Sequence, residues 1–130
     1  MNNWTQGNYL SLATRKRDGS WVYTPVWFAA LDGSFYIFSE GKAGKIKRIR
    51  NFQDVRVAPC TVSGKITGAE QTGIAQILVE DKDKTFAHQA LVNKYGWQMR
   101  LLDLGSALAR KKSKRAFVKI QLTETPQEQA

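Results

Sequence analysis

Hydrophobic and polar positions alternate along most of the first eighty residues, with the two-residue period of β-strands. A sixth alternating stretch lies near the C-terminus. Asp18-Gly19 and Asp32-Gly33 are typical of tight hairpin turns and predict that the first three strands form an antiparallel meander. The predicted strands are Tyr9–Arg15, Trp21–Ala30, Phe35–Phe38, Val55–Val62, Thr72–Val79 and Ala116–Leu122.

Helical spacing replaces this alternation in the remaining segments. Within Ser39–Asn51, apolar residues recur every three positions and predict a short helix. A second helix begins near Asp81 or Asp83 and ends at Gly96. Further helical structure is expected over Met1–Gly7, anchored by Trp4, and over Trp97–Ala109, and the tail from Thr123 is expected to fray.

Six strands in this order, with one helix after the third and a helical pair before the sixth, fit a mainly β fold. The expected architecture is a six-stranded antiparallel split β-barrel of Greek-key type, built as a single domain over residues 1–130. Such a small barrel cannot enclose a large ligand. A sizeable cofactor would therefore bind outside the barrel or between two copies, which favours a homodimer.

Charge indicates an anionic partner. The formal net charge is +9, and the cations are grouped at Arg15–Arg17, in the basic helix and at Arg110–Arg115. No apolar stretch is long enough to span a bilayer, and no secretory signal is evident, so a cytoplasmic location without membrane association is expected.

Several chemistries find no support in the sequence. His88 is the single histidine and has no ligand-spaced neighbours, so no metal site is predicted. No serine has the context of a hydrolase nucleophile, and the glycine motifs of dinucleotide and nucleoside-triphosphate sites do not occur. Cys60 is the only cysteine and is expected to pack inside the fold. Any catalysis would depend on a bound cofactor.

The basic helix is the best candidate for a ligand site. Lys42, Lys45 and Arg48 form a cationic stripe separate from the apolar face, while Gly41 and Gly44 allow close approach to the backbone. Free N–H groups and the positive end of the helix dipole favour a phosphate at the first turn. The alternative is a solvated basic helix.

The second candidate is the aromatic strand around Val22–Phe28. Thr24, Val26 and Phe28 face one way, Tyr23, Pro25 and Trp27 face the other, and Pro25 removes one donor from the ladder. A flat ring could lie against such an edge. The alternative is aromatic barrel core.

These segments together resemble the deazaflavin-dependent branch of the pyridoxamine 5′-phosphate oxidase-like superfamily. The resemblance covers nearly the whole chain, in order. It rests on Thr24–Phe28, Asp32-Gly33, Gly44–Asn51, Val55–Cys60 and Lys94–Trp97. It implies an FMN-binding type split barrel acting as a homodimer, with coenzyme F-420 or, alternatively, FMN in a groove between the subunits.

The resemblance also implies roles for individual residues. Lys45 and Arg48 would hold the cofactor phosphate, helped by Lys42 and Lys47, and Arg56 with Arg110–Arg115 would receive a polyglutamate tail. The strand formed by Thr24, Pro25, Val26 and Trp27 would line the ring. Candidates for the substrate wall are Tyr23, Tyr36, Tyr95 and Trp97.

The expected activity is hydride transfer between the cofactor and an unsaturated small molecule, with the protein supplying orientation and a dry pocket. No catalytic residue is assigned. Two alternatives remain. One is a non-catalytic flavin or tetrapyrrole carrier, and the other is a basic nucleic-acid-binding barrel. The second is disfavoured because the cations gather at turns and helix starts rather than between aromatics on a strand face.

Overall fold

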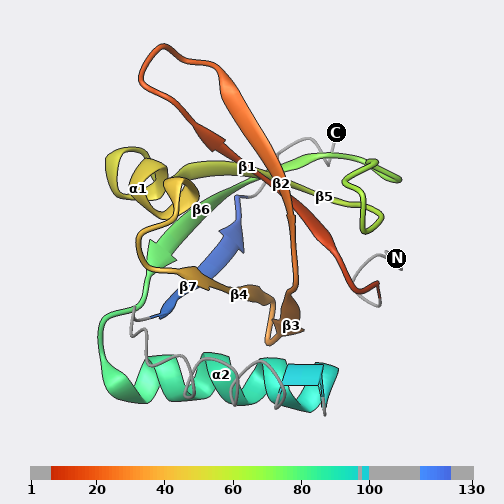
Figure 1. The fold of residues 1–130 in the computed structure, drawn as a ribbon, viewed down its shortest axis with the longest axis vertical. Helices are drawn as coiled ribbons and strands as arrows, with labels where there is room; N and C mark the ends of the chain where they lie inside the picture. Colours follow the sequence, from red (N-terminus) through yellow and green to blue (C-terminus); the bar gives the residue numbers. More distant parts are fainter. Residues whose placement is uncertain (1–6, 97, 100–114, 124–130) are drawn as a thin grey trace.

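A strongly curled antiparallel sheet with two helices forms the structure of the chain, a computed structural model that describes residues 7–96, 98–99 and 115–123 (Figure 1). The helical segments expected for Met1–Gly7 and Trp97–Ala109 and the C-terminal tail lie almost wholly outside the described residues. The elements are β1 (Leu10–Arg15), β2 (Trp21–Val26), β3 (Ala29–Leu31), β4 (Ser34–Glu40), α1 (Gly44–Asn51), β5 (Asp54–Pro59), β6 (Gln71–Ile77), α2 (Asp81–Tyr95) and β7 (Arg115–Leu122).

The sheet has seven strands rather than the six predicted, in the order β2-β1-β5-β6-β7-β4-β3. The additional strand arises because the predicted strand Trp21–Ala30 is broken at Trp27-Phe28. The first half of this predicted strand is β2, which pairs with β1, and the second half is β3, which pairs with β4. Because β2 and β3 are the two outermost strands of the sheet, the break connects one edge of the sheet to the other. This connection requires the sheet to curl, which is consistent with the split-barrel class.

Both predicted Asp-Gly turns are present, and the backbone φ angles explain why glycine occurs in each of them. In the β1–β2 turn Gly19 has φ of +91°, and in the β3–β4 turn Asp32 and Gly33 have φ of +55° and +83°. The two successive positive φ values of the β3–β4 turn characterise the tight turns that match strand twist, whereas the β1–β2 turn has a single positive φ at Gly19. The expected meander is thus formed by two hairpins, β1–β2 and β3–β4, which share one broken strand.

The inner face of the sheet is filled by aliphatic and aromatic side chains. Phe28 and Phe35 meet edge to face with centroids 5.8 Å apart, and α1 inserts Ile46 and Ile49 into the same core. The remaining buried members are Leu10, Leu12, Val26, Ile37, Val55, Val57, Ala75, Ala116, Val118 and Ile120. The interior is therefore packed with side chains, in agreement with a barrel too small to hold a ligand.

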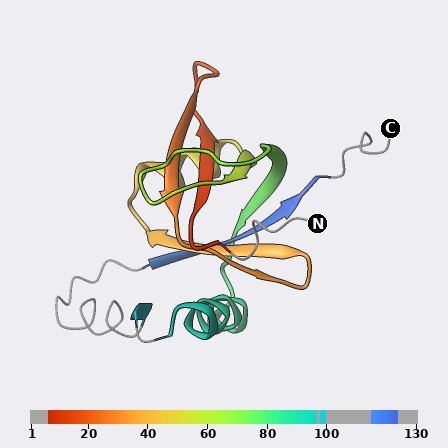
Figure 2. The same cartoon turned by 90° about the vertical axis from the view of Figure 1, so that its right-hand side faces the viewer.

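A second core lies between the sheet and α2. Figure 2 shows α2 on the side of β4 and β7 away from the β1–β2 hairpin. Alternate residues of β4 pack into different cores. Phe35 and Ile37 face the interior of the curled sheet, whereas Tyr36 and Phe38 face α2. From α2, Ala87, Leu91 and Tyr95 are buried against them. Gly96 ends α2 with φ of +59°, as predicted from the sequence.

Candidate functional site

Helix α1 presents cations on one side and anchors itself with the other. Ile46 and Ile49 are buried, which confirms the predicted apolar face. The residue before the helix, Ala43, is extended and provides no side-chain cap, and the first turn contains no acidic residue. Among the described residues, the N–H groups of Gly44 and Lys45 have no hydrogen-bond acceptor. The first turn therefore offers free donors and the positive end of the helix dipole to an anion.

Arg48 lies across this first turn. Its Nε donates a hydrogen bond of 2.7 Å to Oγ1 of Thr14, a residue of β1 that is almost completely buried. A Cβ atom added to Gly44 would lie 2.9 Å from Arg48 Nη1. The guanidinium is thus folded back toward the beginning of α1, and Gly44 leaves the space that it occupies. No hydrogen bond to another described residue uses its two Nη groups, so they are available as a fork for a phosphate.

Lys45 approaches from the same turn. Its Nζ donates a long hydrogen bond of 3.4 Å to Oγ of Ser39, at the end of β4. Burial lowers the pKa of Lys45, and the nearby charge of Arg48 lowers it further. A bound anion would offset both effects because it stabilises the charged form. The two half-buried cations lie close enough for the charge of Arg48 to lower the pKa of Lys45, whereas Lys42 and Lys47 are exposed to solvent.

Thr14 connects this turn to the predicted ring-binding strand. In the β1–β2 ladder, Thr14 pairs with Val22, and Leu12 pairs with Thr24. Directly paired residues share a face of the sheet, so Thr24 and Val26 point inward while Tyr23 and Pro25 point outward. Pro25 is tolerated because β2 lies at the end of the strand order, and the 60–66 loop lies near it, with Pro25 Cδ 3.8 Å from a Cβ added to Gly64.

Trp27 belongs to the break between β2 and β3 rather than to a strand. Its ring stacks on that of Tyr95, with centroids 4.3 Å apart and planes 9° from parallel. The Tyr95 hydroxyl accepts a hydrogen bond from the Phe28 N–H at 2.9 Å. It also lies 2.7 Å from the Asn8 carbonyl and 3.0 Å from the Phe28 carbonyl, either of which it can donate to. Burial raises the pKa of Tyr95 to about 12, so the hydroxyl keeps its proton.

The predicted substrate wall is not assembled as a single surface among the described residues. Tyr23 is 46% exposed on the outward face of β2. Tyr36 is buried in the core beneath α2, against Phe86, and Tyr95 is buried at the strand break. Trp97 lies outside the described residues. The structure therefore brings Tyr95 together with Trp27 and separates both from Tyr23.

Three further residues, to which the sequence analysis assigned no role, contribute to the site. Thr14 and Ser39 hold the two cations, and Lys94 reaches from α2 to the strand break. Lys94 Nζ is buried without a hydrogen-bond partner and lies 3.6 Å from the centroid of the Phe28 ring, and burial lowers its pKa to about 8. Thr14 and Ser39 resemble any other small polar strand residues in sequence, so no local signal marks them.

The remaining cations differ in how firmly they are held. Arg56 lies over the Trp21 ring at 4.2 Å and reaches Glu70 at 3.9 Å. Arg15 pairs with Asp54 at 3.1 Å and lies over Phe52 at 4.6 Å. The run Arg110–Arg115 falls outside the described residues except for Arg115. Within the described part of the chain, no group of His, Cys, Asp or Glu side chains could hold a metal ion, and neither helix is long and apolar enough to cross a membrane.

No protein-family model matches the chain, and no curated protein matches its sequence. Solved structures do match. The haem-storage protein HutZ of Vibrio cholerae has a TM-score of 0.71 at 11% identity, covering 94% of this chain and 87% of that one. An FAD-binding protein from Mesorhizobium loti has a TM-score of 0.64 at 17% identity, with 92% and 82% coverage.

A third match is a proposed pyridoxamine 5′-phosphate oxidase from Listeria innocua, with a TM-score of 0.63 at 13% identity and coverage of 93% and 88%. The fold is that of the pyridoxamine 5′-phosphate oxidase-like split barrels. At these identities the comparison shows the fold alone; of the proteins that share it, one is described as storing haem and one as binding FAD. The expectation of a split-barrel fold therefore agrees with these matches, whereas membership of the deazaflavin branch stays a prediction.

Proposed function

We propose that this protein binds a flavin-type cofactor, coenzyme F-420 or alternatively FMN, and transfers a hydride between it and an unsaturated small molecule. The observation that carries the proposal is that Lys45 and the folded-back guanidinium of Arg48 are neighbouring cations at the uncapped first turn of α1. A phosphate there would receive free N–H groups, a point charge and a guanidinium fork together. A flavin-binding protein with the same fold supports a flavin-like ligand.

The residues present fit such a group. Gly44 leaves room for the folded-back guanidinium, and Thr14 holds it by one edge while its Nη groups stay available. Thr24, Pro25, Val26 and Trp27 would border the ring, with Trp27 held by Tyr95. When bound, the cofactor supplies the hydride chemistry. The protein would bind the phosphate, orient the ring and exclude water from the reacting faces.

We expect the functional unit to be a homodimer with the cofactor groove between subunits. The packed interior leaves no space for a ligand within one barrel. Apolar side chains are exposed around Pro25, on β2 and the adjoining loop, where Val62 is 66% and Ile66 41% exposed. A second copy that covered this surface would complete a groove beside β2. Light scattering with and without FMN would measure the assembly, and a monomer under both conditions would contradict it.

The decisive experiment is a titration of the purified protein with FMN and with coenzyme F-420, followed by ring fluorescence. Wild type is compared with Lys45→Ala/Arg48→Ala and with Lys82→Ala/Lys84→Ala, which removes two cations from α2. The proposal expects binding by wild type and by the α2 variant and at least a tenfold loss in the α1 variant, with unchanged circular dichroism. If all three proteins bind the cofactor with equal affinity, Lys45 and Arg48 do not hold its phosphate.

Turnover separates an enzyme from a carrier. Reduced F-420 or FMN bound to the protein would be mixed with a panel of enones and quinones, and reoxidation of the ring would be followed without oxygen. Reoxidation faster than that of the free cofactor supports the oxidoreductase, and tight binding with no acceleration supports the carrier.

The second candidate function is a tetrapyrrole carrier. Its support is that HutZ and a haem-binding protein of Mycobacterium smegmatis share the fold. A haem titration followed by visible absorbance tests it. Stoichiometric haem binding that Lys45→Ala/Arg48→Ala leaves intact, together with no affinity for FMN or F-420, would favour this candidate over the first.

A further inference from the structure

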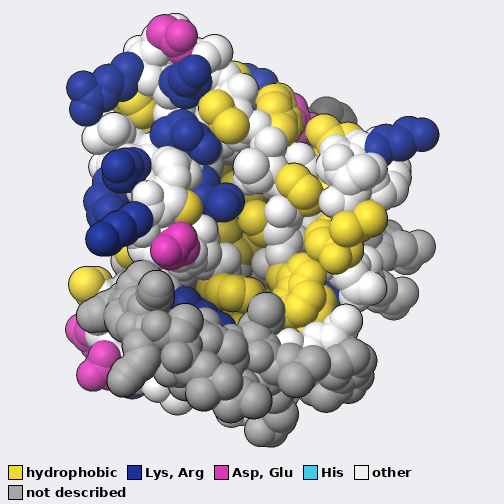
Figure 3. Space-filling model, in the orientation of Figure 1, with side chains coloured by type: hydrophobic (Ala, Val, Ile, Leu, Met, Phe, Trp, Pro, Cys, Tyr) yellow, Lys and Arg dark blue, Asp and Glu magenta, His cyan; other side chains and the backbone are white. Residues whose placement is uncertain are grey.

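Lys94 lies in surroundings unlike those of the surface cations. Lys and Arg side chains form a column on the surface, over the β1–β2 hairpin and α1 (Figure 3). Lys94 belongs to the last turn of α2, and its Nζ is shielded from water, 3.6 Å from the centroid of the Phe28 ring and 5.3 Å from that of Tyr95. Nζ has no hydrogen-bond partner, and no described carboxylate forms an ion pair with it. An ammonium group is thus held against aromatic rings without a counter-charge.

This placement costs free energy. The face of an aromatic ring attracts a cation, but it replaces only part of the hydration that a buried ammonium group loses. Burial accordingly lowers the pKa of Lys94 to about 8, so the group is still mostly protonated at neutral pH. Tyr95 offers no negative charge, because its own pKa of about 12 keeps the hydroxyl protonated. Where a native protein keeps such an unpartnered group, an ion, a water molecule, stored strain or a redox role usually explains it.

The break between β2 and β3 places Lys94 next to the candidate cofactor site. Phe28, whose ring lies beside Nζ, directly follows Trp27 in the chain. The ring of Tyr95, the other ring near Nζ, stacks on that of Trp27 with centroids 4.3 Å apart. Trp27 is also the last residue of the stretch Thr24–Trp27 that would border the ring. The buried cation and the proposed ring site therefore share this corner of the fold.

A row of contacts connects the same corner to the candidate phosphate site. The Trp27 ring meets that of Phe38 edge-on, with centroids 6.4 Å apart. Phe38 is followed in β4 by Ser39, whose Oγ lies 3.4 Å from Lys45 Nζ. A ligand with its phosphate at Lys45 and its ring beside Trp27 would extend toward the corner that contains Lys94.

We propose that Lys94 supplies the positive charge that stabilises the bound ring in its reduced, anionic form. This inference rests on the proposed function and specifies the ligand class, namely a planar ring that gains negative charge when it is reduced. A ring that accepts a hydride takes up two electrons and one proton, so it gains one negative charge until a second proton reaches it. A buried cation nearby favours that anion, and charge near the ring is one way in which a protein tunes such a cofactor.

The effect of Lys94 on the ring and the effect of the ring on Lys94 are equal. If the protonated amine favours the anionic ring, the anionic ring raises the pKa of Lys94 by the same free energy. The protein would therefore bind the reduced ring more tightly than the oxidised one. Lys94 acts here through its charge and not as a catalytic residue, since its shielded Nζ need not touch the ring.

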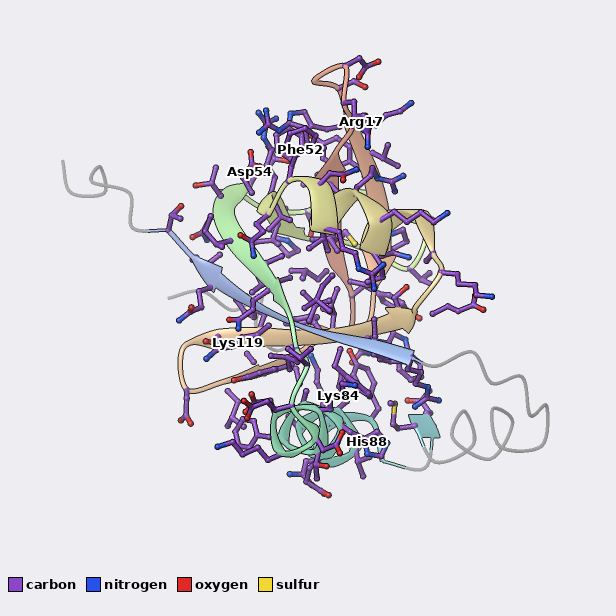
Figure 4. All side chains as sticks on the ribbon, turned by 90° about the vertical axis from the view of Figure 1, so that its left-hand side faces the viewer. Arg17, Phe52, Asp54, Lys84, His88 and Lys119 are labelled. Carbon is purple, nitrogen blue, oxygen red and sulfur yellow. The ribbon has the colours of Figure 1, made fainter. Side chains whose placement is uncertain are left out.

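The first test compares the two oxidation states of the ligand. Affinities for oxidised and reduced FMN and F-420 are measured without oxygen on wild type, Lys94→Met and Lys84→Met. Methionine is unbranched and adaptable, so it replaces the lysine stem and removes the charge. Lys84 lies on α2 as well (Figure 4), about 15 Å nearer the start of the helix, and its loss changes the net charge equally.

The proposal expects the preference for the reduced over the oxidised ring to fall at least fivefold in Lys94→Met, which lowers the two-electron potential of the bound ring by about 20 mV. Lys84→Met should match wild type. Lys94→Met should also be the more stable protein without ligand, whereas a purely structural lysine would not separate the two effects. An unchanged preference, whether or not both affinities fall, would overturn the role of Lys94 alone. If wild type binds neither cofactor, the proposed function fails, and the role of Lys94 with it.

A second measurement follows Lys94 itself. In protein labelled with carbon-13 lysine, the Lys94 Cε resonance is assigned by its loss in Lys94→Met and should titrate near pH 8 without ligand. With the reduced ring bound, the titration should move upward by about 0.7 pH unit, which corresponds to the same fivefold factor, and by less with the oxidised ring. A Lys94 that titrates near 10.5 without ligand, or at the same pH in both complexes, would contradict the proposal.

Discussion

The hydroxyl of Tyr95 forms hydrogen bonds with the backbone of Phe28 at the point where strand pairing is interrupted. Where β2 ends and β3 begins, the Phe28 N–H finds no partner strand, and it donates instead to the Tyr95 hydroxyl at 2.9 Å. The same hydroxyl reaches the carbonyl of Phe28 at 3.0 Å. A side chain from the end of α2 thus replaces part of the ladder and fixes the corner at which the sheet turns.

Tyr95→Phe should destabilise the fold by about 1–3 kcal/mol, because it leaves a buried N–H unsatisfied while keeping the stack on Trp27. Urea unfolding followed by tryptophan fluorescence measures the change. Tyr23→Phe is the matched control, since Tyr23 is exposed and its removal of a hydroxyl should cost less than about 0.5 kcal/mol. Equal effects of the two changes would show that the Phe28 N–H finds another acceptor.

The lowered pKa of Lys94 predicts that the stability of the fold depends on pH. Burial lowers its pKa to about 8 in the folded chain, whereas the unfolded chain keeps the ordinary value of 10.5. Between these values the unfolded state binds more protons, so stability rises as pH increases from 8 to 10.5 and is constant below 8 with respect to this group.

Lys94→Met should therefore be more stable than wild type at pH 7, by about 1–2 kcal/mol, because the folded chain buries the Lys94 ammonium group without a hydrogen-bond partner. The difference should shrink by pH 10. Thermal unfolding of both proteins across this range gives the comparison, in which the other titrating groups cancel. A difference that stays constant with pH would mean that the Lys94 pKa is not lowered.

Gly44→Ala should separate stability from ligand binding. The added Cβ would meet Arg48 Nη1 at 2.9 Å, and the end of a flexible side chain can move away. Alanine is also the better helix former, so we expect unchanged stability or a gain of up to about 1 kcal/mol. The displaced guanidinium should bind phosphate less well, lowering FMN affinity by roughly three- to tenfold. Titration and thermal unfolding of the variant, with Arg48→Gln beside it, test both expectations. A parallel fall in stability and affinity would argue against the guanidinium as the cause.

Gly73→Ala tests the close approach of β6 and β7. A Cβ at this position would lie 2.9 Å from the Gln121 carbonyl oxygen, which belongs to the backbone and cannot move alone. We expect a loss of about 1–3 kcal/mol from the widened ladder, measured by urea unfolding. An unchanged midpoint would indicate that the two strands can separate without cost.

Much of the candidate site was visible in the sequence, and part of it was not. The run Lys42–Arg48 stood out because its charges interrupt an apolar period, and the structure brings Lys45 and Arg48 to the first turn of α1 as two half-buried cations. Thr14 lies 34 residues before Arg48, and nothing local marks it as a partner. The proposed substrate wall also shows that residue type alone does not predict which side chains share a surface. Tyr36 and Tyr95 are buried in the core beside α2, whereas Tyr23 is exposed on β2.

The sequence by itself determined the strands, the turns and the ends of the helices, because each depends on neighbours within a few positions. Alternation gives the strands, positive φ selects Gly19 and Gly33, and Gly96 ends α2. Only the tertiary structure decided that Trp21–Ala30 breaks at Trp27-Phe28 and that Tyr95, 67 residues from Phe28, stabilises the break. A curled sheet must turn where its two ends join. The site of that turn depends on which distant side chain can replace the lost hydrogen bonds, and local periodicity carries no information about that partner.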